Sequence, residues 1–175
     1  AKPVCITTDE AGQNHFKGHP VKGADMAKVI LRRLKFDNDT TDRVCRLVRY
    51  HDDRPELNAR TVRRAMNRIG VENMPALFAV KRADTLGQSM YHRQEKLAYV
   101  DTFERFFREI CAAQQCVQKK DLAISGSDLI AMGMKPGKEI GAVLNELFER
   151  VLDEPELNQR DKLLDMAHNL MTRLI

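Results

Sequence analysis

The stretch KEIGAVLNELFERVLD (residues 138–153) has the clearest helical pattern in the sequence. Its apolar residues recur three and four positions apart. Because an α-helix has 3.6 residues per turn, this spacing places the apolar side chains on one face and leaves the charged ones on the other. The stretch therefore predicts an amphipathic helix that buries one side. The apolar positions are Ile140, Val143, Leu144, Leu147, Phe148, Val151 and Leu152.

Helical spacing runs through nearly the whole chain. No segment shows the sustained alternation of apolar and polar residues that is typical of strands, so we expect no sheet and an all-α fold. The run Asp37-Asn38-Asp39 resembles a pair of metal-binding carboxylates, but its place between two helices favours a turn and a helix N-cap. Besides 138–153, the predicted helices cover residues 20–35, 40–52, 56–69, 74–90, 94–118, 128–132 and 159–175.

Composition excludes several classes of protein. The 175 residues carry a formal net charge of +4, which permits an anionic partner such as nucleic acid without requiring one. No apolar run approaches the roughly 18 residues that a membrane span needs, and the first ten residues do not form a signal peptide. The four cysteines form no CxxC pair, which favours reduced thiols. We therefore expect a cytoplasmic protein.

Two basic segments could contact phosphate groups. Arg60, Arg63, Arg64 and Arg68 gather on the polar side of the 56–69 helix; an ordinary solvated face is the alternative. Lys135 and Lys138 flank a Pro-Gly pair at the start of the 138–153 helix, where free N–H groups attract anions. A plain helix start remains the alternative there.

Three polar residues occupy apolar positions or lie beside them. His51 continues the apolar face of its helix, Asp84 does the same in the 74–90 helix, and His19 precedes the first helix. Two imidazoles and a carboxylate could share a divalent metal ion. The alternatives are hydrogen-bonded core histidines and an Asp84 paired with a neighbour such as Arg82. Asp52 is rotated by about 100° from His51 and is not an expected ligand.

Residues 121–167 resemble the C-terminal tail of bacterial CCA-adding tRNA nucleotidyltransferases and their poly(A) polymerase relatives. They follow the pattern D-L-x-I-x-G-x-D-L, then G-x-x-P-G-x-x-I-G, then L-x-x-L-x-x-x-V-L-x-x-P-x-L-N. The segments at 15–36, 44–52 and 81–88 are similar to the HD-type helical domain of the same enzymes. The positions that fit the tail pattern include Gly126, Asp128, Leu129, Gly133, Pro136, Gly137, Ile140 and Gly141.

The resemblance implies an incomplete metal site. His19, His51 and Asp84 match the later histidines and the closing aspartate of the HD domain, whereas the HD doublet would stand just upstream of Ala1. We therefore expect a fragment with at most a partial ligand set for a divalent metal. A metal-dependent HD-type phosphohydrolase acting on cyclic phosphates or nucleotides remains the alternative function.

The resemblance also places nucleotide transfer outside this chain. In this family an N-terminal head holds two Mg²⁺ ions and uses CTP and ATP, and no motif here matches it. We expect the chain to bind tRNA and position it for 3′-CCA addition or repair by that head, without adding nucleotides itself. The expected parts are a partial HD-like domain (1–93), a connecting helix (94–120) and a tRNA-binding tail (121–175). The long apolar stripe of the 94–118 helix suggests a homodimer through helical surfaces.

Overall fold

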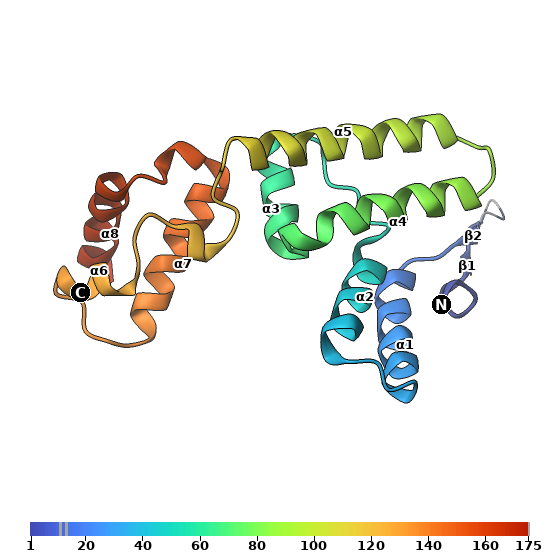
Figure 1. Cartoon of the computed structure of the whole chain (residues 1–175), viewed down its shortest axis with the longest axis horizontal. Coiled ribbons are helices and arrows are strands. Elements are labelled where there is room, and N and C mark those ends of the chain that lie inside the picture. The colour runs from blue at the N-terminus through green and yellow to red at the C-terminus, as the bar shows by residue number, and fades with distance from the viewer. Residues whose placement is uncertain (11, 13, 175) are drawn as a thin grey trace. The chain divides into compact units, whose positions relative to one another are not determined.

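The computed structural model describes residues 1–10, 12 and 14–174, and eight α-helices account for most of them (Figure 1). The all-α prediction is confirmed. The helices are α1 (His19–Arg33), α2 (Asn38–Tyr50), α3 (Ala59–Ile69), α4 (Met74–Gly87), α5 (Arg93–Ala112), α6 (Gly126–Ala131), α7 (Lys138–Asp153) and α8 (Arg160–Leu174). The described residues also contain four 3₁₀ turns, of which the first precedes α1 and the others lie between helices: η1 (Lys2–Cys5), η2 (Val71–Asn73), η3 (Lys119–Asp121) and η4 (Pro155–Leu157).

Two short strands correct the expectation that the chain has no sheet. β1 (Thr7–Thr8) pairs antiparallel with β2 (Asn14–His15), and Thr7 lies opposite His15. Strands of two residues are too short to show a period of two, so the sequence pattern could not reveal them.

Helix ends follow local chemistry. Asp37 caps α2, as predicted: its carboxylate accepts hydrogen bonds from the backbone N–H and the hydroxyl of Thr40, each at 2.7 Å. The helix predicted for 94–118 ends earlier, at Ala112. Gln114 adopts a left-handed conformation with φ 49°, and an α-helix does not continue through such a residue. The helix predicted for 159–175 is present as α8, but Ile175 lies outside the described residues.

The chain divides into two compact units. Unit 1 comprises Ala1–Pro55 and Ile69–Arg105, and unit 2 comprises Glu56–Arg68 and Phe106–Ile175. This division differs from the predicted boundaries at 93 and 120, because α3 groups with the C-terminal helices although it lies early in the sequence.

In unit 1, α4 and α5 contribute a buried apolar core. Phe78 and Phe103 meet edge to face with ring centroids 5.3 Å apart. The apolar stripe of α5 is partly used there, since Val100 is also buried. Helix α1 packs closely on α2, where a Cβ at Gly23 would lie 3.2 Å from Val48. By contrast, α1 and the turn after it expose six large apolar side chains: Val21, Met26, Val29, Ile30, Leu34 and Phe36.

The core of unit 2 forms around α7. The apolar face predicted for residues 138–153 is largely buried, and Leu147 and Val151 are fully enclosed. Side chains from α6 and α8 complete the core, among them Leu129 and Leu163. Each such side chain contributes roughly 1.5–3 kcal/mol when it leaves water. None of the helices in the described part of the chain combines the length and apolar character that a membrane crossing requires.

Candidate functional site

The tail pattern at residues 121–158 holds the elements of unit 2 together. The carboxylate of Asp128 accepts hydrogen bonds from the backbone N–H and the hydroxyl of Ser125 at 2.7 and 2.8 Å, which fixes the start of α6. It also pairs with Arg160 of α8 at 2.6 Å. The Arg160 guanidinium, followed by Ser125, lowers the pKa of Asp128 to about 2.

Two further positions of the pattern brace the same region. Asn158 accepts a hydrogen bond from the Ala123 N–H and donates one to the Asp121 carbonyl, both at 2.9 Å. A Cβ at Gly126 would lie 3.1 Å from Ile140, so glycine allows α6 to approach α7 closely. The residue types at these positions of the pattern are therefore accounted for by contacts within unit 2.

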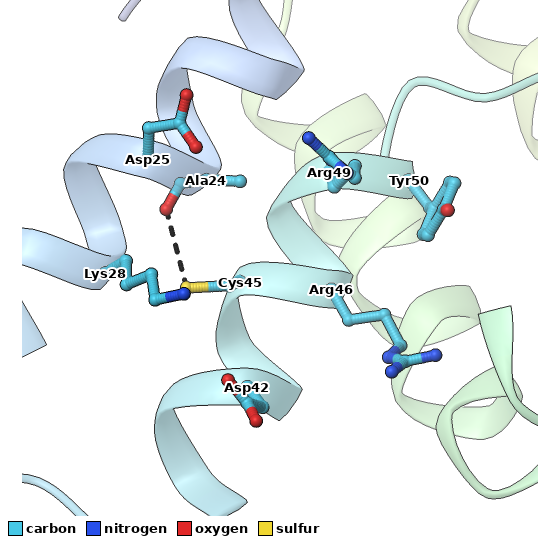
Figure 2. Close-up of a pocket in the computed structure, with 8 residues that line it drawn as sticks. All are labelled: Ala24, Asp25, Lys28, Asp42, Cys45, Arg46, Arg49 and Tyr50. Carbon is cyan, nitrogen blue, oxygen red and sulfur yellow. Dashed lines mark hydrogen bonds between the residues drawn. The ribbon is translucent and has the colours of Figure 1, made fainter. Parts of the chain in front are cut away.

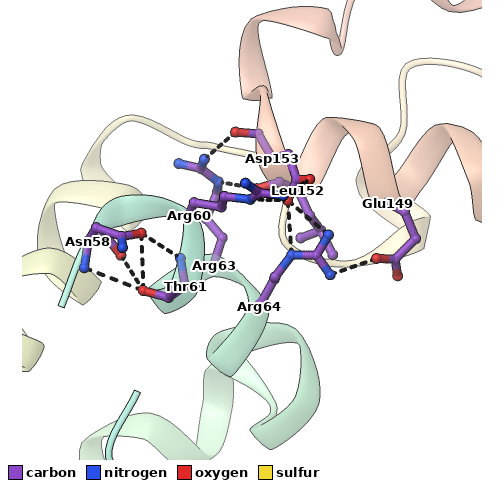
Figure 3. A network of polar contacts seen from close by, with 8 residues as sticks. All are labelled: Asn58, Arg60, Thr61, Arg63, Arg64, Glu149, Leu152 and Asp153. Carbon is purple, nitrogen blue, oxygen red and sulfur yellow. Dashed lines mark hydrogen bonds and ion pairs between the residues drawn. The ribbon is translucent and has the colours of Figure 1, made fainter. Parts of the chain in front are cut away.

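Arg63, a predicted RNA contact, caps the end of α7 (Figure 3). It is only 4% exposed, and its Nε and Nη2 donate to the carbonyls of Leu152 and Asp153 at 2.7 and 2.9 Å. Its Nη1 donates to the side chain of Gln115 at 3.0 Å. Leu152 and Asp153 end α7, where carbonyls have no partner within the helix. Burial lowers the pKa of Arg63 from its usual value, yet a guanidinium stays charged.

Arg60 and Arg64 meet the side chain of the same aspartate. Arg60 donates to both carboxylate oxygens of Asp153, at 2.8 and 2.5 Å. Arg64 donates to Asp153 at 2.9 Å and to Glu149 at 2.7 Å. Hydrogen bonds to Asp153 and Glu149 raise the pKa of Arg64, and Arg60 is the main cause of the lowered pKa of Asp153. RNA contact by these arginines stays a prediction. Phosphate groups would compete with existing partners at Arg63 and Arg64, whereas the Nη1 of Arg60 takes no part in its pair with Asp153.

Two of the other predicted RNA contacts, Lys135 and Lys138, lie apart from this cluster. Lys135 and Lys138 are exposed at the N-terminal end of α7, whereas the arginines meet its C-terminal end. The 16 residues of α7 span about 24 Å, so the structure does not bring these lysines and the arginines of α3 into one patch. Arg68 is exposed near the end of α3.

The structure brings the two predicted histidines of unit 1 together. The Nε2 atoms of His19 and His51 lie 3.3 Å apart. Each Nδ1 faces a backbone carbonyl, that of Phe16 at 2.8 Å and that of Val48 at 2.6 Å. Because a carbonyl only accepts, both Nδ1 atoms carry hydrogen, and the two Nε2 atoms face each other across the gap. A metal cation between the rings could bind both Nε2 atoms.

This geometry fits two ligand positions of one divalent metal. Nitrogens bound at about 2.1 Å to a tetrahedral or octahedral ion lie roughly 3.0–3.4 Å apart, and ligating histidines usually donate their other N–H to an oxygen. Across the residues that the structure describes, however, no group of three or more His, Cys, Asp or Glu side chains is placed to hold a metal. The three-residue metal set stays a prediction.

Asp84, the third predicted ligand, has a partner of its own. Its carboxylate accepts a hydrogen bond from Gln88 at 2.6 Å, and it lines a small pocket of about 20 Å³ together with His51. Such a pocket holds roughly one water molecule. Arg82, suggested above as its ion-pair partner, instead pairs with Asp101 and Glu104.

Lys81 is a residue that the sequence analysis did not single out. It is buried in unit 1, and its Nζ donates to the carbonyl of His51 at 2.9 Å and to that of Asp53, just beyond the end of α2. Burial lowers the pKa of Lys81 to about 8. Its position four residues after Leu77 and three after Phe78 could have indicated that it points inward.

A family model for tRNA nucleotidyltransferase domain 2 matches residues 21–167. The chain belongs to this family. The matched range contains the tail pattern, the arginines of α3 and both His51 and Asp84, whereas His19 lies just before it.

Relatives of known activity agree with this family. A CC-adding tRNA nucleotidyltransferase of Thermus thermophilus is 29% identical over 154 residues, which are 85% of this chain and 32% of the relative. An A-adding tRNA nucleotidyltransferase of Deinococcus radiodurans is 29% identical over 158 residues, covering 87% of this chain and 36% of the relative. A CCA-adding enzyme of Lacticaseibacillus paracasei is 37% identical over 73 residues, 42% of this chain and 18% of the relative.

The chain spans about a third of the length of the Thermus and Deinococcus enzymes. No solved structure matches the chain significantly. Membership in the tRNA nucleotidyltransferase domain 2 family therefore rests on sequence, and the contacts described above supply the structural reason for its tail pattern.

Proposed function

We propose that this chain is the C-terminal portion of a CCA-adding tRNA nucleotidyltransferase, and that it binds tRNA and positions the 3′ end for CCA addition or repair by a head domain. The observation that carries this proposal is the family match over residues 21–167. Relatives named for CC-, CCA- and A-addition support it, because two of them are named as tRNA nucleotidyltransferases and the three names differ in the nucleotides added.

The chemistry of the chain suits binding better than catalysis. A protein that accepts every tRNA should contact phosphate and sugar, with little reading of base edges. The net charge of +4 favours such contacts, as do the exposed cations Arg68, Lys135 and Lys138. Arg63 and Arg64 would contribute by shaping unit 2, and their present partners would compete with phosphate groups. Arg60 could bind a phosphate through its Nη1 while it keeps its pair with Asp153.

The binding proposal is tested by fluorescence anisotropy with labelled tRNA that lacks its 3′ CCA. Affinity should fall steeply between about 50 and 200 mM salt, because each phosphate contact releases a condensed counterion. A DNA duplex of similar length serves as the control polyanion and should bind more weakly. Absence of tRNA binding, or affinity independent of salt, would contradict the proposal.

A second assay tests whether this chain transfers nucleotides to tRNA. The chain is incubated with tRNA, CTP, ATP and Mg²⁺, and labelled nucleotide in the tRNA is measured. No incorporation is expected, because the family's nucleotide transfer is assigned to a head domain whose motifs this sequence lacks. Incorporation at the 3′ end would refute that assignment.

A further inference from the structure

A groove of about 400 Å³ lies between α1 and α2 in unit 1 (Figure 2). Cys45 of α2 donates a hydrogen bond to the Ala24 carbonyl of α1 at its floor, at 3.4 Å. Most of the groove lining is charged or polar. Three cations, two carboxylates and one phenol contribute: Lys28, Arg46, Arg49, Asp25, Asp42 and Tyr50.

The cations follow a regular spacing on α2. Arg46 and Arg49 line the groove, and Arg43, outside the lining, continues their three-residue spacing on one side of the helix; all three are exposed. Arg43 to Arg49 spans about 9 Å of helix axis, the axial rise of two or three nucleotides in one strand. Lys28 lines the groove from α1, and its side chain ends beside Cys45 in Figure 2.

Arg60, Arg63 and Arg64 of α3 bind carboxylates or carbonyls, whereas most of the cations of α1 and α2 named above do not. Among the described residues, the side-chain cations of Lys28, Arg43 and Arg49 have no hydrogen bond or ion pair. Arg46 donates to the Ile69 carbonyl at 3.2 Å, which orients its guanidinium. A phosphate could therefore bind Lys28 or Arg49 without displacing an existing partner.

We propose that the α1–α2 groove binds the phosphate–ribose backbone of RNA. Guanidinium groups bind phosphate oxygens through paired hydrogen bonds. Asp25 and Asp42 would repel phosphate but can accept hydrogen bonds from ribose 2′-hydroxyls, which DNA lacks. A groove with both kinds of group suits a backbone that alternates phosphate with hydroxyl donors. The assignment rests on the proposed function, since tRNA is the RNA in question.

The test compares two charge-reversal variants of the whole chain. In Lys28→Glu/Arg49→Glu we expect the Kd for tRNA to rise at least tenfold at 50 mM salt, and the slope of log Kd against log salt to fall by about two. Lys17→Glu/Lys120→Glu changes the net charge equally at exposed lysines outside the groove, and should bind like the unaltered chain. If circular dichroism shows that the first variant is unfolded, Lys28→Gln/Arg49→Gln replaces it.

The possible results separate the two proposals. If the unaltered chain binds tRNA and both double variants bind equally well, or equally poorly, the groove assignment is overturned while the proposed function stands. If the unaltered chain does not bind tRNA, both fall. Asp25→Asn/Asp42→Asn should reduce the preference for RNA over DNA of the same sequence, and an unchanged preference counts against the ribose contacts. Equal competition by poly-glutamate would show that the groove recognises an acidic protein as readily as RNA, which overturns the assignment to RNA.

Discussion

Replacing Arg63 by alanine should destabilise unit 2 strongly. The substitution removes three hydrogen bonds of a buried guanidinium and leaves the carbonyls of Leu152 and Asp153 without that partner. A hydrogen bond to a charged group contributes about 1.5–3 kcal/mol, and these three are coupled because one side chain makes them all. Water entering the vacated space would recover part of the loss. We therefore expect the free energy of unfolding to fall by about 3 kcal/mol.

Arg60 provides the matched control. It is an arginine on the same helix that binds the same aspartate, but its side chain is 62% exposed. Exposed ion pairs contribute about 0–1 kcal/mol, so Arg60→Ala should change stability little. A loss of about 3 kcal/mol from a unit of this size should lower Tm by about 12–24 °C. Arg60→Ala should lower Tm by only a few degrees.

Urea and thermal unfolding, followed by circular dichroism, measure both variants against the unaltered chain. The C-capping role of Arg63 is refuted if the two substitutions lower stability equally, or if Arg63→Ala costs less than about 1 kcal/mol. Arg63→Lys separates charge from geometry: it keeps the cation but loses the planar fork, and should recover only part of the stability.

Three further predictions concern other parts of the chain. Because the pKa of Asp128 is lowered from 3.8 to about 2, its ionised carboxylate stabilises the fold above about pH 4, and this stabilisation is lost as the pH falls toward 2. In Asp128→Asn, the free energy of unfolding from urea curves should therefore depend less on pH in this range. After dialysis against Mn²⁺ or Ni²⁺, elemental analysis should find less than one tightly bound ion per chain and a separate assay no phosphodiesterase turnover, since His19 and His51 are joined by no third ligand among the described residues; a stoichiometric ion that is lost in Asp84→Asn, together with turnover, would favour the phosphohydrolase alternative. The homodimer suggested by the stripe of residues 94–118 is better placed on the exposed apolar side chains of α1, since part of that stripe is buried: light-scattering mass should rise with concentration, Ile30→Glu should abolish the rise, and a constant mass in the unaltered chain contradicts dimerisation.

Helical periodicity predicted the elements well because the signal is local. The apolar face of residues 138–153 is the core of unit 2, and Asp37 caps α2 as its residue type indicates. The early end of α5 was missed because the turn is made by Gln114, without the glycine or proline that marks most helix ends.

The candidate site could be predicted only in part, because its partners are distant in sequence. The charge of Arg63 predicted a solvated or RNA-binding position on its helix. Its backbone partners instead lie 89 and 90 residues away in the sequence, at the end of α7. No local pattern reports such a contact. His19 and His51 could be predicted because each lies at, or next to, a position where the helical pattern calls for an apolar side chain. The structure places their two rings in contact.

The discontinuous make-up of unit 2 has a consequence for its synthesis. Segment 56–68 leaves the ribosome about 90 residues before the end of α7, a delay of roughly 4–18 s at ordinary rates of elongation. Val62 and Met66 are fully buried in the finished structure. During that time the rest of unit 2 is incomplete, so these two side chains cannot yet be buried in it. Closing so long a loop costs about 4 kcal/mol of chain entropy apart from a constant. Docking of α3 should therefore be a late and slow step, and the nascent chain is most exposed to aggregation and to chaperones before α7 is complete.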